Sequence, residues 1–293
     1  MKRSLSLSLF CVLASTFATA GTYESPGRPE AGDPHYDLEE LYAAAEFKKG
    51  LEETKARIAA TPNDPELYWL GSRFMFEIGE QFERTDSRLD KKRWYQDLVA
   101  MSQKGLDIAP DHPHLKFTWA VGTARLATTK GVLKSLFTAK TVEKTWIEVA
   151  ESGFRYESLD GNEILPCDAF LTLGIFYRLV PDSVVVKALA GTKGDLKLSL
   201  DWHTRSNRCR PGRIGSVKEL GVTQLCLGKK KKDQSMVEKG QRTLRDMQKL
   251  PSTTATDDID KRHGLMLAED PSLACEYSRD GQQDYEKDSK NMK

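Results

Sequence analysis

The sequence predicts an all-α fold: an array of antiparallel helix pairs, an α-solenoid, that ends in a C-terminal capping helix. Apolar residues recur at helical spacing along most of the chain between residues 37 and 270. The same proline punctuation also occurs twice, as Pro62-Asn-Asp-Pro and as Pro110-Asp-His-Pro, set 48 residues apart. A helix pair with its linker accounts for this period, and such units bury their apolar faces only by stacking on one another.

The first twenty residues have the pattern of an export signal. Lys2 and Arg3 precede an apolar run, and Ala18-Thr19-Ala20 gives the small-x-small pattern of a signal peptidase site. We expect cleavage between Ala20 and Gly21, and a periplasmic or secreted product. The apolar run is too short for a membrane span, which needs about 20 residues. No later stretch approaches that length, so we expect no stable membrane span.

Lipid attachment at Cys11 is the alternative to simple cleavage. The residue before a lipidated cysteine is normally small, whereas here it is Phe10. We therefore favour an exported protein without a lipid anchor.

The charge balance argues against nucleic acid as the main partner. The chain holds 44 basic and 43 acidic residues, and removal of Lys2 and Arg3 leaves 42 and 43. Nucleic-acid binding needs a concentrated basic face. The only dense basic run is Lys229–Lys232, between two predicted helices. We interpret it as a solvated loop, with contact to an anionic surface as the alternative.

The first part of the chain predicts a leader and two helical stretches. Residues 21–36 are rich in glycine, proline and charge, which is typical of a flexible leader. Asp37 is the expected N-cap of a helical stretch that runs to Ala60, with a turn within residues 43–47. After the first proline mark, a helix is expected over residues 66–78, with Gly79 as its stop.

The middle of the chain continues the same pattern. Helices are expected over residues 91–108, from about 115 to 127, and from 132 to about 152. The stretch 165–181 predicts one buried helix, because apolar residues cover most of its circumference and Pro181 ends it. The array is organised around this helix.

The last part of the chain predicts three more helices and a cap. Residues 182–194 are expected to be an irregular connector, after which Asp195 caps a helix that runs to about residue 207. Helices over 213–227 and 233–249 follow, and 257–269 forms the capping helix. The helical-repeat domain therefore spans residues 37–270, and residues 271–293 form a polar tail, expected to be mobile from Glu276 onward.

Four cysteines remain after cleavage, an even number, which in an oxidising compartment predicts disulfides with three pairings open. If helices alternate up and down, Cys167 lies at the same end as Cys209, and Cys226 at the same end as Cys275. Cys209 and Cys226 are separated by most of a helix, roughly 20 Å, which is too far for a bond. We therefore predict Cys167–Cys209 and Cys226–Cys275.

Several segments carry a family resemblance. DPELYWLGSRF at 64–74, LTLGIFYRLVP at 171–181, Gly194-Asp195 and the closing LRDMQKLP resemble tetratricopeptide-like proteins over residues 37–251. Within that group, the sequence is most similar to the T-component of TRAP-type transporters and to the repeat domain of the regulator of microtubule dynamics family. The resemblance implies a tetratricopeptide-like array that binds a protein, or a small ligand, in a concave or central surface.

No catalytic motif is present. The sequence contains no GxSxG, no Walker-type glycine loop and no HExxH. His112 and His114 form a metal half-site at most, and a turn or helix-start motif explains them better. We therefore expect no enzyme, no metal and no cofactor, although a site assembled from distant residues stays open as the alternative.

Four residues are the best candidates for a binding surface. Arg73 and Arg125 each lie on an otherwise apolar inner helix, where a guanidinium either pairs with an internal carboxylate or faces a groove. We favour the internal pairing. Trp69 and Trp119 belong to the same helices, and we interpret them mainly as core, with ligand stacking as the alternative.

These observations favour a protein-interaction scaffold. We expect an exported helical-repeat protein that binds another protein of the envelope or of a solute-transport system, through its inner helices. The alternatives are an enzyme without a local motif and a protein that binds a small ligand in the inner groove.

Overall fold

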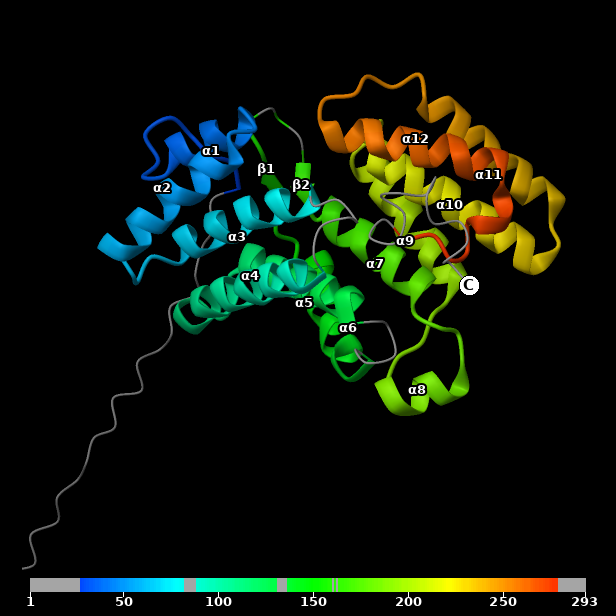
Figure 1. The fold of residues 1–293 in the computed structure, drawn as a ribbon, viewed down its shortest axis with the longest axis horizontal. Coiled ribbons are helices and arrows are strands. Elements are labelled where there is room, and N and C mark those ends of the chain that lie inside the picture. The colour runs from blue at the N-terminus through cyan, green and yellow to red at the C-terminus, as the bar shows by residue number, and fades with distance from the viewer. Residues whose placement is uncertain (1–26, 82–87, 131–135, 160, 162, 279–293) are drawn as a thin grey trace, which may run out of the picture.

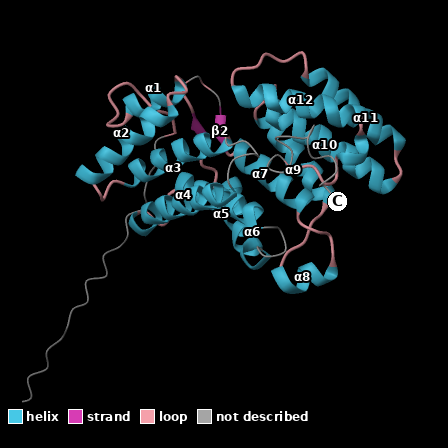
Figure 2. Ribbon diagram, in the orientation of Figure 1, coloured by secondary structure: helices cyan, strands magenta, loops and turns pink. Residues whose placement is uncertain are grey.

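The computed structural model describes residues 27–81, 88–130, 136–159, 161 and 163–278 of the 293-residue chain. Over these residues, twelve α-helices and one two-stranded sheet form the molecule (Figures 1 and 2). The all-α class predicted from the sequence is confirmed. The predicted signal peptide and its cleavage site at Ala20 and Gly21 lie outside the described residues.

The helices follow one another in pairs along the chain. They are α1 (Tyr36–Ala43), α2 (Phe47–Ala60), α3 (Pro65–Glu80), α4 (Arg88–Ile108), α5 (Pro113–Lys130), α6 (Leu136–Glu151), α7 (Cys167–Leu179), α8 (Val184–Ala190), α9 (Leu196–Cys209), α10 (Ile214–Lys231), α11 (Gln234–Met247) and α12 (Ala255–Glu269). Most of them pack chiefly on their neighbours in sequence, from α2 on α3 to α11 on α12, whereas α7 packs on α9. This nearest-neighbour packing is that of a solenoid.

The proline punctuation and the capping residues explain where several helices begin. Pro65 and Pro113 are the first residues of α3 and α5, where a missing backbone N–H costs nothing. The carboxylate of Asp64 accepts from the backbone N–H of Glu66, and Asp195 caps α9 as predicted. Asp37, however, is not an N-cap. It lies in the first turn of α1, where it pairs with Arg57.

Three predicted boundaries are wrong for identifiable reasons. Gly79 does not end its helix: α3 runs on to Glu80, and a Cβ at Gly79 would lie 3.1 Å from Trp94 and Tyr95. The predicted connector 182–194 contains helix α8, which Ser183 caps through two backbone N–H groups. The predicted lysine loop is instead the last turn of α10, where positive side chains interact favourably with the helix dipole.

A short β-hairpin interrupts the helices and was not predicted. Strand β1 (Tyr156–Glu157) pairs antiparallel with β2 (Glu163–Leu165). Leu165 therefore belongs to the sheet, and the helix expected from that residue begins at Cys167 after Pro166. The predicted flexible leader also contributes here, because the backbone N–H of Glu157 donates to the carbonyl of Gly27 at 2.8 Å.

Within the described residues, the core consists of two main clusters of buried side chains and a small third one, in which Val186 and Ala190 of α8 pack with Ala139 of α6. The larger cluster joins α1 to α7 and α9 and includes Leu67, Leu98 and Leu173. The smaller one lies between α10, α11 and α12 and includes Leu225 and Leu244. Figure 1 shows two parts of the molecule, α1 to α6 on one side of α7 and α10 to α12 on the other, with α8 projecting from the body.

The C-terminal segment is part of the folded unit up to residue 278. Pro271–Leu273 forms a 3-10 turn, and Ala274 and Tyr277 are fully buried in the smaller cluster. The predicted boundary at residue 270 therefore ends the domain too early. The sequence pattern suggested a polar tail because polar residues surround Tyr277 in sequence, although its large ring is buried.

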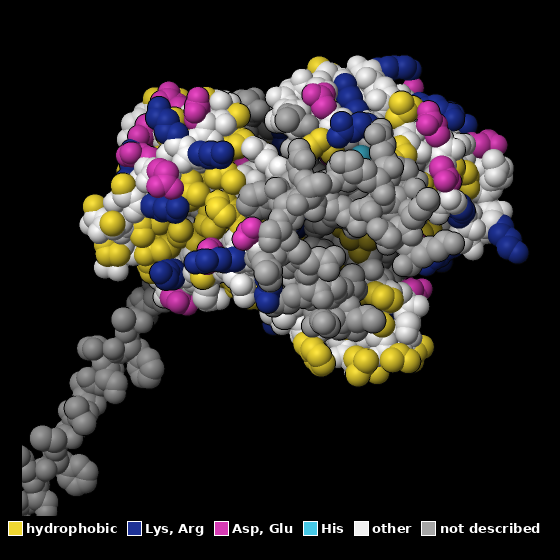
Figure 3. All heavy atoms as spheres, viewed as in Figure 1, with side chains coloured by type: hydrophobic (Ala, Val, Ile, Leu, Met, Phe, Trp, Pro, Cys, Tyr) yellow, Lys and Arg dark blue, Asp and Glu magenta, His cyan; other side chains and the backbone are white. Residues whose placement is uncertain are grey.

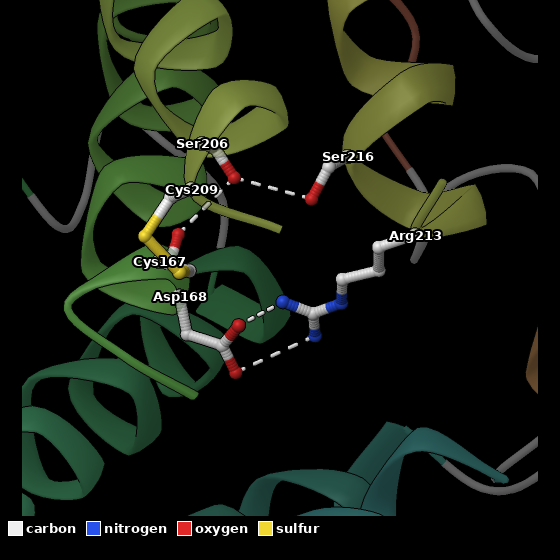
Figure 4. The surroundings of a disulfide bond; sticks show 6 residues. All are labelled: Cys167, Asp168, Ser206, Cys209, Arg213 and Ser216. Carbon is white, nitrogen blue, oxygen red and sulfur yellow. Dashed lines mark hydrogen bonds and ion pairs between the residues drawn. A yellow bond between two sulfur atoms is a disulfide. The ribbon is translucent and has the colours of Figure 1, made fainter. Parts of the chain in front are cut away.

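Both disulfides expected from the sequence are present, Cys167–Cys209 and Cys226–Cys275. The first joins the start of α7 to the end of α9 (Figure 4). Beside it, Asp168 pairs with Arg213, which precedes α10. The loops closed by the two bonds span 42 and 49 residues. In the chain-entropy account each such bond stabilises by about 3–4 kcal/mol.

Candidate functional site: an interior cavity

A cavity of about 720 Å³ lies between the two parts of the molecule. Ligand pockets typically measure about 300–1,000 Å³, so a small organic molecule fits this one. Its lining side chains include Tyr42 from α1, Trp69 and Arg73 from α3, Phe117 and Val121 from α5, Val142 and Trp146 from α6, Ile175 and Phe176 from α7, and Lys218 from α10. The cavity is therefore a product of the whole array rather than of one helix pair.

One wall of the cavity is apolar. It is built from the facing sides of α5, α6 and α7, where Val121, Val142 and Ile175 meet aromatic rings. Trp146 packs edge-on against Phe176, with ring centroids 6.1 Å apart. Because aliphatic and aromatic groups dominate this wall, it favours the apolar part of a ligand.

Arg73 forms the polar end of the cavity on the α3 side. Its Nη1 donates to Oε2 of Glu39 at 2.7 Å, and the Tyr156 hydroxyl donates to the other oxygen of that carboxylate at 2.8 Å. The guanidinium carbon lies 3.4 Å from the centroid of the Tyr42 ring. Burial opposes the charge, but the Glu39 carboxylate raises the pKa of Arg73 above its ordinary value. Arg73 is therefore a charged group in an aromatic cage.

His114 lies beside Arg73. Its ring stacks on Trp69 with centroids 3.9 Å apart, and it meets Tyr156 edge-on at 4.5 Å. Burial, followed by the proximity of His112 and Arg73, holds the pKa of His114 well below its ordinary value. The imidazole is consequently neutral at pH 7.

Two more carboxylates of α3 border the cavity. The Tyr42 hydroxyl donates to Glu77 at 2.6 Å, and burial raises the pKa of that carboxyl. Arg125 pairs with Glu80 at 2.6 Å. The sequence predicted either an internal carboxylate partner or a position in a groove for Arg73 and Arg125, and the internal partner was favoured. Each has its carboxylate partner, and each also lines the cavity.

The two predicted tryptophans have different surroundings. Trp69 is buried and lines the cavity. Trp119 is half-buried against the larger core cluster and is not among the cavity residues. Of the four residues proposed as a binding surface, the structure thus brings three together.

A charged network forms the α10 side of the cavity. Arg178 pairs with Glu219 at 2.7 Å, and Lys218 contacts both Glu219 at 3.1 Å and Asp260 at 2.8 Å. Burial acts against ionisation, but Lys218 and Arg178 lower the pKa of Glu219 to about 2. This network was not predicted from the sequence. The adjacent charged residues Lys218 and Glu219, within an otherwise apolar stretch of a helix, could have indicated it.

The histidine pair of the second proline mark stands at the start of α5, in agreement with its interpretation as a helix-start motif. Both rings are buried, and their centroids lie 5.9 Å apart. Within the described ranges, no cluster of three or more histidine, cysteine or acidic side chains is placed to hold a metal ion. None of the described helices has the length and hydropathy to cross a membrane.

Comparisons with known proteins give no family. No family model and no curated protein matches the chain. One solved chain that is similar in shape is described as "MamA RS-1 ArsTM double mutant", with 15% sequence identity and a TM-score of 0.40. The match covers 72% of this chain and 92% of that one. At this level the likeness bears on neither the fold nor the function of the chain.

Proposed function

We propose that the protein is a binding protein that takes a small, mainly apolar molecule into this cavity. The observation that carries the proposal is the cavity of about 720 Å³ itself. An apolar wall with a few polar groups at its ends is the usual composition of a ligand site. Small-ligand binding is one of the alternatives that the sequence leaves open.

We propose further that no covalent bond is made or broken there. The acidic and basic groups of the cavity are largely engaged with one another, as in Arg73–Glu39 and Arg178–Glu219. A side chain that is already engaged in an ion pair is less available to take up or release a proton for a substrate than a free one. The two disulfides support an oxidising location, and we propose a periplasmic or secreted protein.

Ligand binding can be tested by filling the cavity with a larger side chain. Ala124 lines it on α5, whereas Ala59 is exposed on α2. We expect the apolar fluorescent dye N-phenyl-1-naphthylamine to bind the wild type and Ala59→Trp equally, and Ala124→Trp at least about tenfold more weakly. Tenfold corresponds to about 1.4 kcal/mol of lost contact. Equal dye binding by Ala124→Trp would contradict the proposal.

The filled variant needs a check on its fold. Circular dichroism and the thermal midpoint distinguish a folded, blocked protein from an unfolded one. If Ala124→Trp unfolds, Val121→Phe offers a smaller obstruction on the same wall. Undiminished dye binding by a folded Val121→Phe would count against the cavity as the site.

A protein-interaction scaffold is the second candidate, because one apolar patch is unusually exposed. The patch consists of Val184, Val185 and Leu189 on α8, which are 83%, 66% and 60% exposed. Phe137, on the helix α6 against which α8 packs, is also 82% exposed. In Figure 3 hydrophobic surface covers α8 where it projects from the body. Large exposed apolar groups that cluster in this way mark interaction sites. An envelope or solute-transport protein is the partner we propose for it.

A further inference from the structure

We infer that the Arg73–His114 end of the cavity binds a neutral hydrogen-bond acceptor, a carbonyl or hydroxyl oxygen, at the head of a mainly apolar ligand. The inference rests on the proposed ligand binding and adds the chemical class of the ligand. Two observations support it: two buried polar atoms without a hydrogen-bond partner in the described part of the chain, and the carboxylates that already neutralise the positive charge of Arg73.

The two atoms are Nη2 of Arg73 and Nε2 of His114. Both are buried, and neither has a hydrogen-bond partner among the residues that the structure describes. The two side chains are 7% and 3% exposed, and both line the cavity. Buried polar groups are almost always hydrogen-bonded in native proteins, so two such atoms beside the same aromatic rings call for an explanation.

Arg73 and His114 lie at the same end of the cavity because they share two aromatic neighbours. The Arg73 guanidinium carbon lies 5.5 Å from the Trp69 centroid and 5.7 Å from that of Tyr156. The His114 ring lies 3.9 Å and 4.5 Å from the centroids of the same two rings. Both side chains therefore border the same two rings, and the inference places the polar head group of the ligand beside them.

Charge balance selects a neutral head group. The positive charge of Arg73 is already matched by Glu39 at 2.7 Å, and Glu77 lies on the same helix one turn further on. A carboxylate ligand would add a negative charge to a buried pair that needs none, and an unmatched buried charge is costly. A neutral oxygen accepts from Nη2 without that cost, and the neutral His114 ring either donates to the same head group or accepts from its hydroxyl.

The apolar wall accounts for the rest of the ligand. From the Arg73 end, the lining continues through Phe117, Val121, Trp146 and Phe176. These side chains carry no charge, and burying a ligand's hydrocarbon against them favours binding through the hydrophobic effect. A medium-length aliphatic or aromatic body with a single polar end fits both parts of the cavity.

The test uses four probes with the same ten-carbon body: 1-decanol, methyl decanoate, decanoate and decane. Each is titrated against the dye-loaded wild type by displacement. We expect 1-decanol and methyl decanoate to bind at least about tenfold more tightly than decane, because each offers an oxygen that accepts a hydrogen bond and decane does not. Tenfold corresponds to about 1.4 kcal/mol. Decanoate should bind more weakly than methyl decanoate.

His114→Phe is the decisive variant, because it keeps the stack on Trp69 and removes the polar atom. It should bind decane as the wild type does and lose about tenfold for the two neutral polar probes. The matched control is His203→Phe: His203 is equally buried, its ring nitrogens have no hydrogen-bond partner among the described residues, and it does not line the cavity. That variant should keep the wild-type order of affinities.

A second variant tests the arginine without leaving a buried charge. Arg73→Met combined with Glu39→Gln removes both members of the pair, and it should abolish the preference for the polar probes while the dye still binds. Thermal midpoints establish that each variant is folded.

The outcomes separate the inference from the proposed function. Equal affinity for all four probes, unchanged in His114→Phe, would overturn the inference and leave ligand binding standing; a buried water would then satisfy the two atoms. Tightest binding of decanoate would also overturn it, as would an equal loss in His203→Phe. If the dye and all four probes fail to bind, the proposed function itself is wrong.

Discussion

Burial determines the protonation of two core histidines, His114 and His203. Desolvation lowers the pKa of His203 from 6.5 to about 3, despite the opposing effect of Glu219. The ring also lies flat on α7, since a Cβ at Gly174 would be only 2.4 Å from it. Both histidines are therefore neutral in the native state, whereas the unfolded chain protonates them below about pH 6.5.

This difference predicts an acid-sensitive fold. Protons that only the unfolded state binds destabilise the native state, so the free energy of unfolding should fall as the pH drops from about 6.5 toward 3. One such histidine contributes a slope of about 1.4 kcal/mol per pH unit. Between pH 7 and pH 5, His203→Phe should lose about 2 kcal/mol less than the wild type in urea unfolding followed by circular dichroism. Equal losses would show that His203 is hydrated or protonated in the native state.

The sequence predicted the type of environment for the buried arginines but not for the histidines. A guanidinium among apolar residues is costly unless it is paired, and this argument led to internal partners for Arg73 and Arg125. A histidine next to a proline mark is compatible with a surface turn or with the core. His114 is buried because Trp69, from the preceding helix pair, covers its ring, and that contact leaves no trace in local sequence.

Helix α8 is the element whose surface differs most from its surroundings. Ser183 caps its first turn. On the inner face of the helix Val186 and Ala190 are buried, whereas Val184, Val185 and Leu189 on the outer face are exposed. A helix of seven residues gains little stability from its own hydrogen bonds. Its exposed valines and leucine are therefore better explained by contact with a partner than by helix stability.

Charged substitutions on α8 should abolish that contact without unfolding the protein. Because Val184 and Leu189 are exposed, Val184→Asp with Leu189→Asp should change the thermal midpoint by no more than about 2–4 °C. We expect the yield of in-cell cross-links from a photoreactive residue at position 185 to fall at least tenfold, measured by mass spectrometry. Leu198→Asp, at an exposed apolar position on α9 outside the patch, is the control. An unchanged yield would exclude the patch as a docking site.

Element by element, long periodic segments were predictable and short ones were not. Carboxylates such as Asp195 and the proline at Pro65 predicted helix starts because their chemistry is local. The sequence of α8 is rich in β-branched residues and therefore suggested a loop. Strands of two or three residues are too short to show any periodicity. The two disulfides were predictable, because alternation of helices determines which cysteines lie at the same end.

For the whole molecule, the cavity is the feature that sequence cannot reveal. An apolar helix face that lines a cavity has the same periodicity as one that packs on a neighbour, so α5, α6 and α7 predicted a core. The cavity exists because the two parts of the array, each with its own core cluster, meet around it. Its charged ends come from α3 and α10, which are more than a hundred residues apart in sequence.

Native mass spectrometry of the protein recovered from its expression host tests the central claim most directly. The account predicts a bound small molecule, one per chain, that organic extraction releases as a neutral and mainly apolar compound. The same preparation of Ala124→Trp should carry none. A wild-type mass equal to that of the polypeptide with its two disulfides, unchanged after addition of 1-decanol, would contradict the account.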